Sequence, residues 1–261
     1  MKRKHFFEFE DHTWFPDIIR RGATDYLRFL IEKLNFYKDS VPVIKEIMEV
    51  TGEKEILDLC SGGGGGIVKI HRGLEALTGE KIHITLSDKF PNLSAFRRIG
   101  EDTGGAITYV KESVDAVNVS SRLKGVRTMF SALHHFCPED VKEILRNSAA
   151  SKAPIAFFDG GGNRLINALG ILITHPFIFF FCTPFIKPFR WSRIFFTYIV
   201  PLIPVCTVWD GIASVFRFYS PDELKELVKD KSLESYRWKT GITKGRLSMK
   251  MSYLTGCHKG D

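Results

Sequence analysis

The chain has 261 residues and a formal net charge of +7, and its 44% of hydrophobic residues suffice to bury the core of one α/β domain with additions. The positive charge is compatible with nucleic acid or an anionic membrane as a partner and does not choose between them. The five cysteines stand apart without a C-x-x-C pair, which argues against a disulfide framework and predicts reduced thiols in a cytosolic setting.

The first 53 residues form a leader ahead of the first expected strand. Its opening, residues 1–12, has no apolar run before its acidic residues, so no signal peptide is expected. Apolar positions between Ile18 and Leu34 favour one or two helices. A second helix is expected from Ser40 to Val50, with a proline in its first turn.

A strand, a glycine-rich turn and a helix follow directly after the leader. Residues 56–59 read Ile-Leu-Asp-Leu, which suits a buried strand, and five glycines follow at 62–66. Apolar residues then recur at helical spacing from Ile67 to Leu77, and Gly79 ends the pattern. Because glycine lets the backbone turn sharply and approach a ligand closely, this order predicts the start of a βαβ nucleotide site.

The spacing of the small residues separates two cofactor classes. No register of the glycine tract gives G-x-G-x-x-G, and the tract is not a phosphate loop ending in Gly-Lys-Ser/Thr. Instead, small residues occupy every second place after an acid, at Asp58, Cys60, Gly62 and Gly64. This pattern resembles motif I of the class I S-adenosylmethionine-dependent methyltransferases, usually D-x-G-x-G-x-G, with a cysteine in place of the first glycine. The alternative is a flexible glycine tract, against which the apolar order on both sides argues.

The resemblance implies S-adenosylmethionine as the cofactor. The second expected strand, 82–86, ends just before Asp88, where an acid accepts the ribose hydroxyls in Rossmann-like folds. After the third expected strand, 106–110, this family often places an acid that binds the adenine amino group; Asp115 is the choice and Glu112 the alternative. For Asp88 and for the acid after the third strand, the alternative interpretation is a solvent-exposed loop residue without a cofactor role. The resemblance implies these cofactor-binding residues: Asp58, Cys60, Ser61, Gly62, Gly63, Gly64, Asp88, Lys89, Asp115, Ala116 and Ser131.

Two histidines follow the fourth expected strand, 126–133, as His134 and His135. Ligands of open α/β sheets lie at the carboxyl ends of the strands, and family members commonly place a His-rich or acidic element here, facing the transferred methyl. Proton transfer by either histidine is one hypothesis. The other is a structural or cofactor-packing part, because in-line methyl transfer often needs orientation alone. We expect no metal, because adjacent histidines on a strand point apart and no third ligand is suitably spaced.

A helix from Pro138 to Ala150 and a fifth strand, 154–158, continue the doubly wound alternation. That strand runs into Asp159 and three more glycines. Family members commonly carry N-terminal helices as a lid over the cofactor, so aromatic residues of the leader could contact cofactor or substrate. Simple packing on the domain is the alternative for these aromatic residues. The candidate substrate-binding residues are Trp14, Phe15, Tyr26 and Asp159.

Two uncharged runs, 165–186 and 194–209, flank Lys187, Arg190 and Arg193. The first run has the length of a transmembrane helix. However, the chain must return to finish the same sheet, and two spans would leave the three cations on the far side, against the positive-inside bias. We therefore expect a hydrophobic helical hairpin in the membrane interface, with its cations at anionic headgroups. The alternative is an apolar substrate cap, packed on the domain or in a dimer.

The end of the chain returns to the sheet. Ser220-Pro221-Asp222-Glu223 is a capping box that begins a helix to about Lys229. A sixth strand is expected at 236–240, and alternation over 247–253 predicts an antiparallel edge strand. The expected fold is a Rossmann-like doubly wound seven-stranded α/β sheet with an antiparallel C-terminal hairpin. Its expected domains are an N-terminal helical lid at 1–53, a cofactor-binding methyltransferase domain at 54–163 and 210–261, and a hydrophobic helical insertion at 164–209.

The sequence thus predicts an S-adenosylmethionine-dependent methyltransferase at the cytoplasmic face of a membrane, with an apolar or lipid-like small molecule as acceptor. Membrane contact is expected through residues 165–209. One alternative is a membrane-docked protein that binds the cofactor without turnover, which the departure at Cys60 leaves open. The other is an RNA methyltransferase. A phenylalanine-rich insertion is a poor partner for phosphate, so nucleic acid is not the expected substrate.

Overall fold

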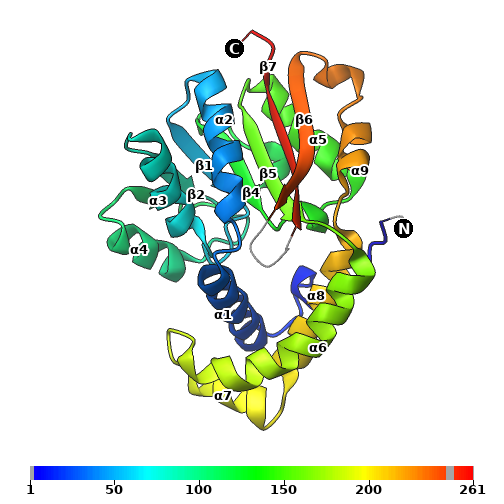
Figure 1. The fold of residues 1–261 in the computed structure, drawn as a ribbon. Coiled ribbons are helices and arrows are strands. Elements are labelled where there is room, and N and C mark those ends of the chain that lie inside the picture. The colour runs from blue at the N-terminus through cyan, green and yellow to red at the C-terminus, as the bar shows by residue number, and fades with distance from the viewer. Residues whose placement is uncertain (1–2, 245–249, 261) are drawn as a thin grey trace.

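The computed structural model describes residues 3–244 and 250–260 (Figure 1). Seven strands form one sheet in the order β3-β2-β1-β4-β5-β7-β6, in which β7 runs antiparallel to β5 and β6 and the other neighbours are parallel. The strands are β1 (Glu55–Leu59), β2 (His83–Leu86), β3 (Ile107–Tyr109), β4 (Val126–Phe130), β5 (Ile155–Gly160), β6 (Tyr236–Lys244) and β7 (Lys250–His258). The expected seven-stranded Rossmann-like sheet with an antiparallel C-terminal hairpin is confirmed.

Helices cover both faces of the sheet, because successive side chains of each strand point to opposite faces. In β1, Ile56 packs into the core on one face, and Leu57 packs into the core on the other. Both faces are buried, so the central strands read as short apolar runs in the sequence. The covering helices are α2 (Val41–Thr51), α3 (Ile67–Thr78) and α4 (Leu93–Asp102) on the first face, and α5 (Pro138–Ala150) and α9 (Pro221–Leu227) on the second.

A second group of helices, which we call the helical lobe, lies below the sheet where the parallel strands end (Figure 1). Its own apolar core includes Phe15, Tyr26, Phe179 and Ile203. The leader is therefore divided between two bodies of the fold, because α1 belongs to the lobe while α2 covers the sheet. The helices of the lobe are α1 (Asp17–Leu34), α6 (Arg164–Cys182), α7 (Trp191–Tyr198) and α8 (Leu202–Arg217).

Two expectations about the strands are wrong. The fourth strand ends at Phe130, not Leu133, because Ser131 takes a left-handed backbone (φ 50°) and a 3₁₀ turn follows. The last strand, β7, lies between β5 and β6, so β6 forms the edge of the sheet. Part of the expected edge strand, 247–249, lies outside the described residues.

The short 3₁₀ helices are η1 (Phe9–Asp11), η2 (Lys38–Ser40), η3 (Ala116–Asn118), η4 (Leu133–His135), η5 (Thr183–Phe185) and η6 (Lys231–Leu233).

Arg193 does not belong to an exposed cation cluster, contrary to expectation. Its side chain is 2% exposed and forms an ion pair with Asp25 of α1 at 2.7 Å. It also donates to the carbonyl oxygens of Ile186 and Pro188. A buried guanidinium needs such partners, so Arg193 ties the connection between α6 and α7 to α1.

The capping box before α9 is confirmed. The Ser220 hydroxyl accepts from the Glu223 amide at 3.2 Å, and the Ser220 amide donates to the Glu223 carboxylate at 2.9 Å. The helix begins at Pro221 as expected and ends at Leu227.

Candidate active site

A cleft opens at the carboxyl ends of β1 and β4, between the glycine tract and α1. Thr24 and Arg28 of α1 line the cleft on the side opposite the sheet. The helix lies close to the glycine tract, because a Cβ added to Gly65 would lie 3.3 Å from the Arg28 Cα. The cleft thus lies at the edge where ligands of open α/β sheets bind. Its lining includes seven of the sequence-predicted cofactor residues, Asp58, Cys60, Ser61, Gly62, Gly63, Gly64 and Ser131, together with Tyr37 and Phe130.

Asp58 lies buried beneath the loop and organises it. Its carboxylate accepts from the Ser61 hydroxyl at 2.6 Å and from the Thr128 hydroxyl at 2.7 Å. Burial raises the pKa of Asp58 to about 7, although both hydrogen bonds act against that rise.

Two residues of the cleft other than glycine adopt left-handed backbone conformations. Cys60 has φ 55° and Ser131 has φ 50°. Cys60 stands where motif I usually has a glycine, and the structure keeps the glycine-like conformation despite the side chain, at a cost of about 1 kcal/mol. Burial raises the pKa of the Cys60 thiol. The thiol therefore stays protonated and acts as a small apolar group.

The glycines of the loop are needed for different reasons. Gly62, Gly64 and Gly66 all have positive φ, at 54°, 67° and 82°. A Cβ at Gly64 would come within 2.3 Å of Ile99, whereas a Cβ at Gly62 would meet no atom within 4 Å. A side chain at Gly62 would therefore not fill the turn of the protein alone. Such a side chain would strain the backbone and project into open space.

Asp88 and Asp115 lie beside the cleft at successive strand ends. The Asp88 carboxylate accepts from the Gly62 and Phe90 amides, each at 2.8 Å. Asp115 forms an ion pair with Lys89 at 2.7 Å, and this hydrogen bond lowers the pKa of Asp115. The other Asp115 oxygen accepts from the Val117 amide at the start of η3, which also carries the buried Ala116. Glu112, the alternative to Asp115 as the acid that binds the adenine, is exposed.

A pair of buried polar residues connects the ends of β4 and β5. His134 Nδ1 donates to Asp159 Oδ1 at 2.8 Å, and both side chains are at most 5% exposed. Asp159 Oδ2 is buried and has no hydrogen-bond partner among the described residues. The pair leaves the Nε2 lone pair of His134 available.

The reason for expecting the two histidines to point apart is wrong. They lie in η4, a 3₁₀ turn and not a strand, and their ring centroids are 4.3 Å apart. A strand would alternate the side chains, whereas this turn brings both rings to one side.

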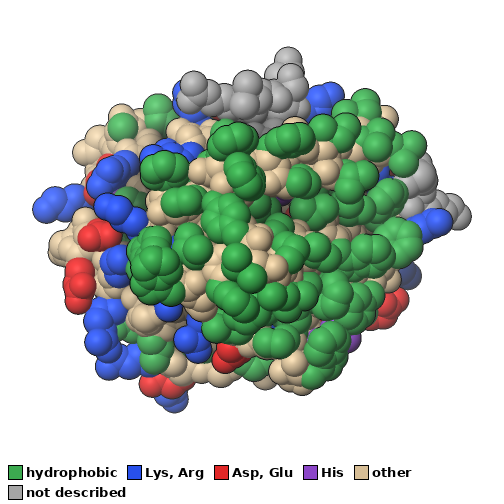
Figure 2. Space-filling model, turned by 90° about the horizontal axis from the view of Figure 1, so that it is seen from below, with side chains coloured by type: hydrophobic (Ala, Val, Ile, Leu, Met, Phe, Trp, Pro, Cys, Tyr) green, Lys and Arg blue, Asp and Glu red, His purple; other side chains and the backbone are tan. Residues whose placement is uncertain are grey.

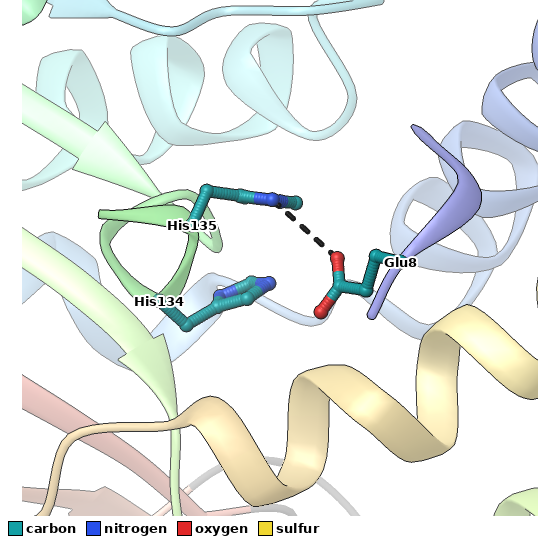
Figure 3. A group of neighbouring side chains, drawn as sticks. All are labelled: Glu8, His134 and His135. Carbon is teal, nitrogen blue, oxygen red and sulfur yellow. Dashed lines mark ion pairs between the residues drawn. The ribbon is translucent and has the colours of Figure 1, made fainter. Parts of the chain in front are cut away.

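The N-terminal segment brings acids to these histidines, which sequence reasoning missed. Glu8 lies 3.4 Å from His135 Nδ1 (Figure 3), and Asp11 lies 2.8 Å from the same nitrogen. Arg217 at the end of α8 contacts Glu8 at 3.2 Å and Asp11 at 2.6 Å. Burial raises the pKa of Glu8 to about 7. The available signal was the acidic stretch of residues 8–11 between phenylalanines, whose burial only the tertiary contacts reveal.

The aromatic residues expected at the substrate do not line the cleft. Phe15 and Tyr26 belong to the core of the helical lobe, where the Tyr26 ring stacks on Phe179 with centroids 3.6 Å apart. Trp14 is 63% exposed and stacks beside His12. Of the four candidate substrate residues, the structure brings only Asp159 to the histidines.

Comparisons with known proteins identify the fold. No protein-family profile and no curated protein matches the sequence, but many solved structures match the chain. The O-methyltransferase NcsB1 from neocarzinostatin biosynthesis is 14% identical over 93% of this chain, with a TM-score of 0.54. The plantazolicin methyltransferase BpumL is 12% identical over 96%, with a TM-score of 0.52. An O-methyltransferase family protein from Burkholderia thailandensis is 12% identical over 91%, with a TM-score of 0.51.

The lengths covered differ among these proteins. The chain covers 93% of BpumL but only 59% of NcsB1 and 60% of the Burkholderia protein. It spans 54 to 60% of several related O-methyltransferase chains. The matches cover more than 90% of this chain, so they extend beyond the segments that carried the sequence resemblance. The chain has the fold of the class I S-adenosylmethionine-dependent methyltransferases.

Proposed function

We propose that this protein transfers a methyl group from S-adenosylmethionine to an apolar small molecule at a membrane surface. The observation that carries the proposal is the loop after β1, which turns through positive φ at Cys60, Gly62 and Gly64 and bonds to Asp88 at the end of β2. Such a loop admits a nucleoside closely and needs no phosphate. NcsB1 and BpumL, which share the fold, were both solved with S-adenosylhomocysteine.

The cleft offers a distinct partner to each part of that cofactor. The Asp88 carboxylate accepts the hydrogen bonds of the ribose hydroxyls. It lies at the rim of the cleft, where it already accepts hydrogen bonds from two backbone amides. Asp115 and Ala116 take the adenine, with Lys89 released from its ion pair. Asp58 lies toward the methionine end, where a nearby positive charge favours its ionised form.

The acceptor meets the cofactor at the ends of β4 and β5. When bound, S-adenosylmethionine supplies an electrophilic methyl group for in-line displacement. Ser131 and His134 follow β4, and Asp159 is the next-to-last residue of β5. These three residues orient the attacking atom, which is the main requirement of such a displacement. The buried oxygen of Asp159 that lacks a partner among the described residues is suited to accept a hydrogen bond from the acceptor.

The apolar character of the acceptor and the membrane contact are inferred from the helical lobe. Seen from below the sheet, the lobe presents a broad hydrophobic face with Lys and Arg at its border (Figure 2). Soluble monomers rarely expose apolar patches larger than a few hundred Å². Side chains that are more than 60% exposed include Phe177, Phe180, Phe181, Phe185, Trp191 and Ile199.

The arrangement of α6 and α8 favours docking over spanning. The helical segment 164–185 is long and apolar enough to cross a membrane, with a mean hydropathy of 2.0. Only 6% of its 18-residue apolar stretch is buried inside the protein. However, Arg164 at the start of α6 donates to the carbonyl of Phe218 just after α8, at 2.8 Å. The chain segment from α6 to α8 therefore leaves the sheet domain and returns to it at one place. Asp210 and Arg217 of α8 are also buried against the N-terminal segment, where lipid cannot surround them.

The cofactor assignment is tested by calorimetry with S-adenosylmethionine and S-adenosylhomocysteine. Replacing Asp88 by Asn should weaken binding by about 1–3 kcal/mol, because the variant cannot serve two ribose hydroxyls as a carboxylate does. Glu101→Gln is the matched control, since Glu101 is an exposed acid of α4 outside the lining of the cleft, and its affinity should equal that of the wild type. Unchanged affinity in Asp88→Asn would remove Asp88 from the ribose role, and no binding heat in the wild type would overturn the proposal.

The acceptor class is tested by transfer of a labelled methyl group into a total lipid extract and into total RNA. The proposal expects label in the lipid extract. Cofactor binding without any transfer would favour the membrane-docked binding protein, and label in RNA would favour the RNA methyltransferase. Flotation with liposomes tests the membrane contact separately from the chemistry.

A further inference from the structure

Three potential metal ligands converge beside the proposed transfer site. Glu8 from the N-terminal segment and His134 and His135 from η4 each offer one ligand atom, and these atoms lie within 4.8 Å of one another. Figure 3 shows the Glu8 carboxylate directed toward both imidazole rings. A tetrahedral zinc ion holds its ligands about 2.0–2.1 Å away, which places them about 3.4 Å apart, so small side-chain rotations would complete the geometry.

The groups that would orient His134 and Glu8 are already in place, whereas Nδ1 of His135 would exchange its hydrogen bond to Asp11 for the ion. The Asp159 carboxylate accepts from His134 Nδ1 at 2.8 Å, which leaves Nε2 with the free lone pair. Glu8 Oε1 accepts from the Ser214 hydroxyl at 3.1 Å and faces Arg217, while Oε2 faces His135. Metal-binding histidines generally donate their other ring nitrogen to a carboxylate in this way. Glu8 can therefore bind an ion through Oε2 while Arg217 stays on Oε1.

The charge around the three ligands favours a cation. Among the described residues, the carboxylates of this region outnumber its arginines, and one buried oxygen of Asp159 and one of Glu10 have no hydrogen-bond partner. Burial of unbalanced carboxylates is costly, and a divalent ion would offset that cost. The carboxylates are those of Glu8, Glu10, Asp11, Asp159 and Asp210, and the arginines are Arg3, Arg20 and Arg217.

We propose that Glu8, His134 and His135 bind one divalent transition-metal ion, with Zn²⁺ as the best match to two imidazoles and one carboxylate. Three protein ligands leave a fourth position open, as in catalytic zinc sites. The role of the ion rests on the proposed function: it polarises a hydroxyl group of the acceptor. The acceptor oxygen would then form its bond to the methyl carbon as the carbon–sulfur bond breaks. The electron pair of that bond would stay on sulfur, S-adenosylhomocysteine would leave, and the hydroxyl proton would pass to water.

The test measures metal binding directly and needs neither the cofactor nor an acceptor. The full chain is stripped with a chelator and titrated with Zn²⁺ by calorimetry and with Co²⁺ by visible absorption, which reports tetrahedral coordination. We expect one ion per chain. Glu8→Gln and His135→Ala should each weaken binding at least about tenfold, and Asp159→Asn, which removes the carboxylate behind His134, should weaken it by about 10–100-fold.

His12→Ala is the matched control, because His12 lies on the same N-terminal segment and stacks on Phe7 and Trp14 away from the cluster. Its affinity for Co²⁺ should equal that of the wild type. The proposal is overturned if the wild type binds no ion, or if folded Glu8→Gln and His135→Ala bind it as tightly as the wild type. The wild-type stoichiometry decides the matter even if a variant fails to fold. Cofactor calorimetry on the same stripped protein separates this failure from failure of the proposed function.

Discussion

At the scale of single residues, burial controls the chemistry of the cleft. Asp58 lies 4% exposed beneath the glycine loop, and burial raises its pKa from 3.8 to about 7. In the unfolded chain the same carboxyl group ionises near 4. Between these two values the folded protein keeps a proton that the unfolded chain has lost.

This difference predicts how stability depends on pH. The contribution of Asp58 to the free energy of unfolding should fall as pH rises from 4 to 7 and stay constant above 7, with a total loss on the order of 4 kcal/mol at most. Asp58→Asn cannot ionise and should lack this loss. Urea denaturation of both proteins across this range is the measurement. Burial raises the pKa of Glu8 and Glu10 to about 7 as well, so the difference between the two proteins isolates Asp58. Parallel pH profiles would contradict the assignment.

Cys60 offers a second residue-level prediction. It holds a glycine-like φ of 55° at the edge of the cleft. Cys60→Val should lower the free energy of unfolding by more than about 1 kcal/mol, since a β-branched side chain suits this conformation poorly. Cys60→Gly should bind the cofactor about as well as the wild type. Thermal denaturation and calorimetry on both variants are the measurements. Equal stability of the valine variant would show that the strain is absent.

At the scale of elements, the lobe is attached to the sheet domain by polar contacts as well as apolar packing. α8 carries an exposed apolar side, with Val205 61% and Trp209 48% exposed. Its opposite side holds Asp210, whose carboxylate accepts from the amides of Phe9 and Glu10. One helix therefore serves the apolar face and the candidate active site together.

Loss of the buried ion pair between Arg193 of α7 and Asp25 of α1 should lower the free energy of unfolding measurably. Arg193→Ala should destabilise the fold by about 3 kcal/mol, because Asp25, which is 16% exposed in the wild type, would lose its main partner. Arg28 and Arg190 stay near Asp25, so the cost should lie at the lower end of the range for buried pairs. Arg190→Ala is the control and should cost less than about 1 kcal/mol, since Arg190 is 41% exposed. Chemical denaturation compares the two, and equal small effects would contradict the role given to Arg193.

At the scale of the whole molecule, the proposed docking to a membrane combines the hydrophobic face with its cationic border. Lys187 and Arg190 are exposed between α6 and α7, beside the exposed Trp191. Changing both cations to Gln should weaken binding to anionic vesicles by about 1 kcal/mol each and remove much of its dependence on salt. Flotation at low and high salt is the measurement. Lys225→Gln with Lys229→Gln, in and just after the distant α9, provides a control with the same charge change. If the two pairs behave alike, the face does not dock through its cationic border.

Much of the sheet and of the cofactor cleft could be predicted, because their signals are local in sequence. An apolar run, a glycine tract and acids at several strand ends are read within a few residues, and parallel strands must bring such ends to one edge. The details that failed depend on contacts between distant segments. Arg193 is buried because α1 supplies Asp25, and Phe15 and Tyr26 turn away from the cleft because α6 and α8 enclose them.

The sequence by itself determined the class of fold and the glycine loop that lines the cleft, since backbone conformation and hydrophobic periodicity are local properties of the chain. Only the tertiary structure decided which polar groups meet. It brought Glu8 and Asp11 to His135 and paired His134 with Asp159. Such meetings depend on how the helical lobe packs beneath the sheet, and no spacing in the sequence encodes that packing.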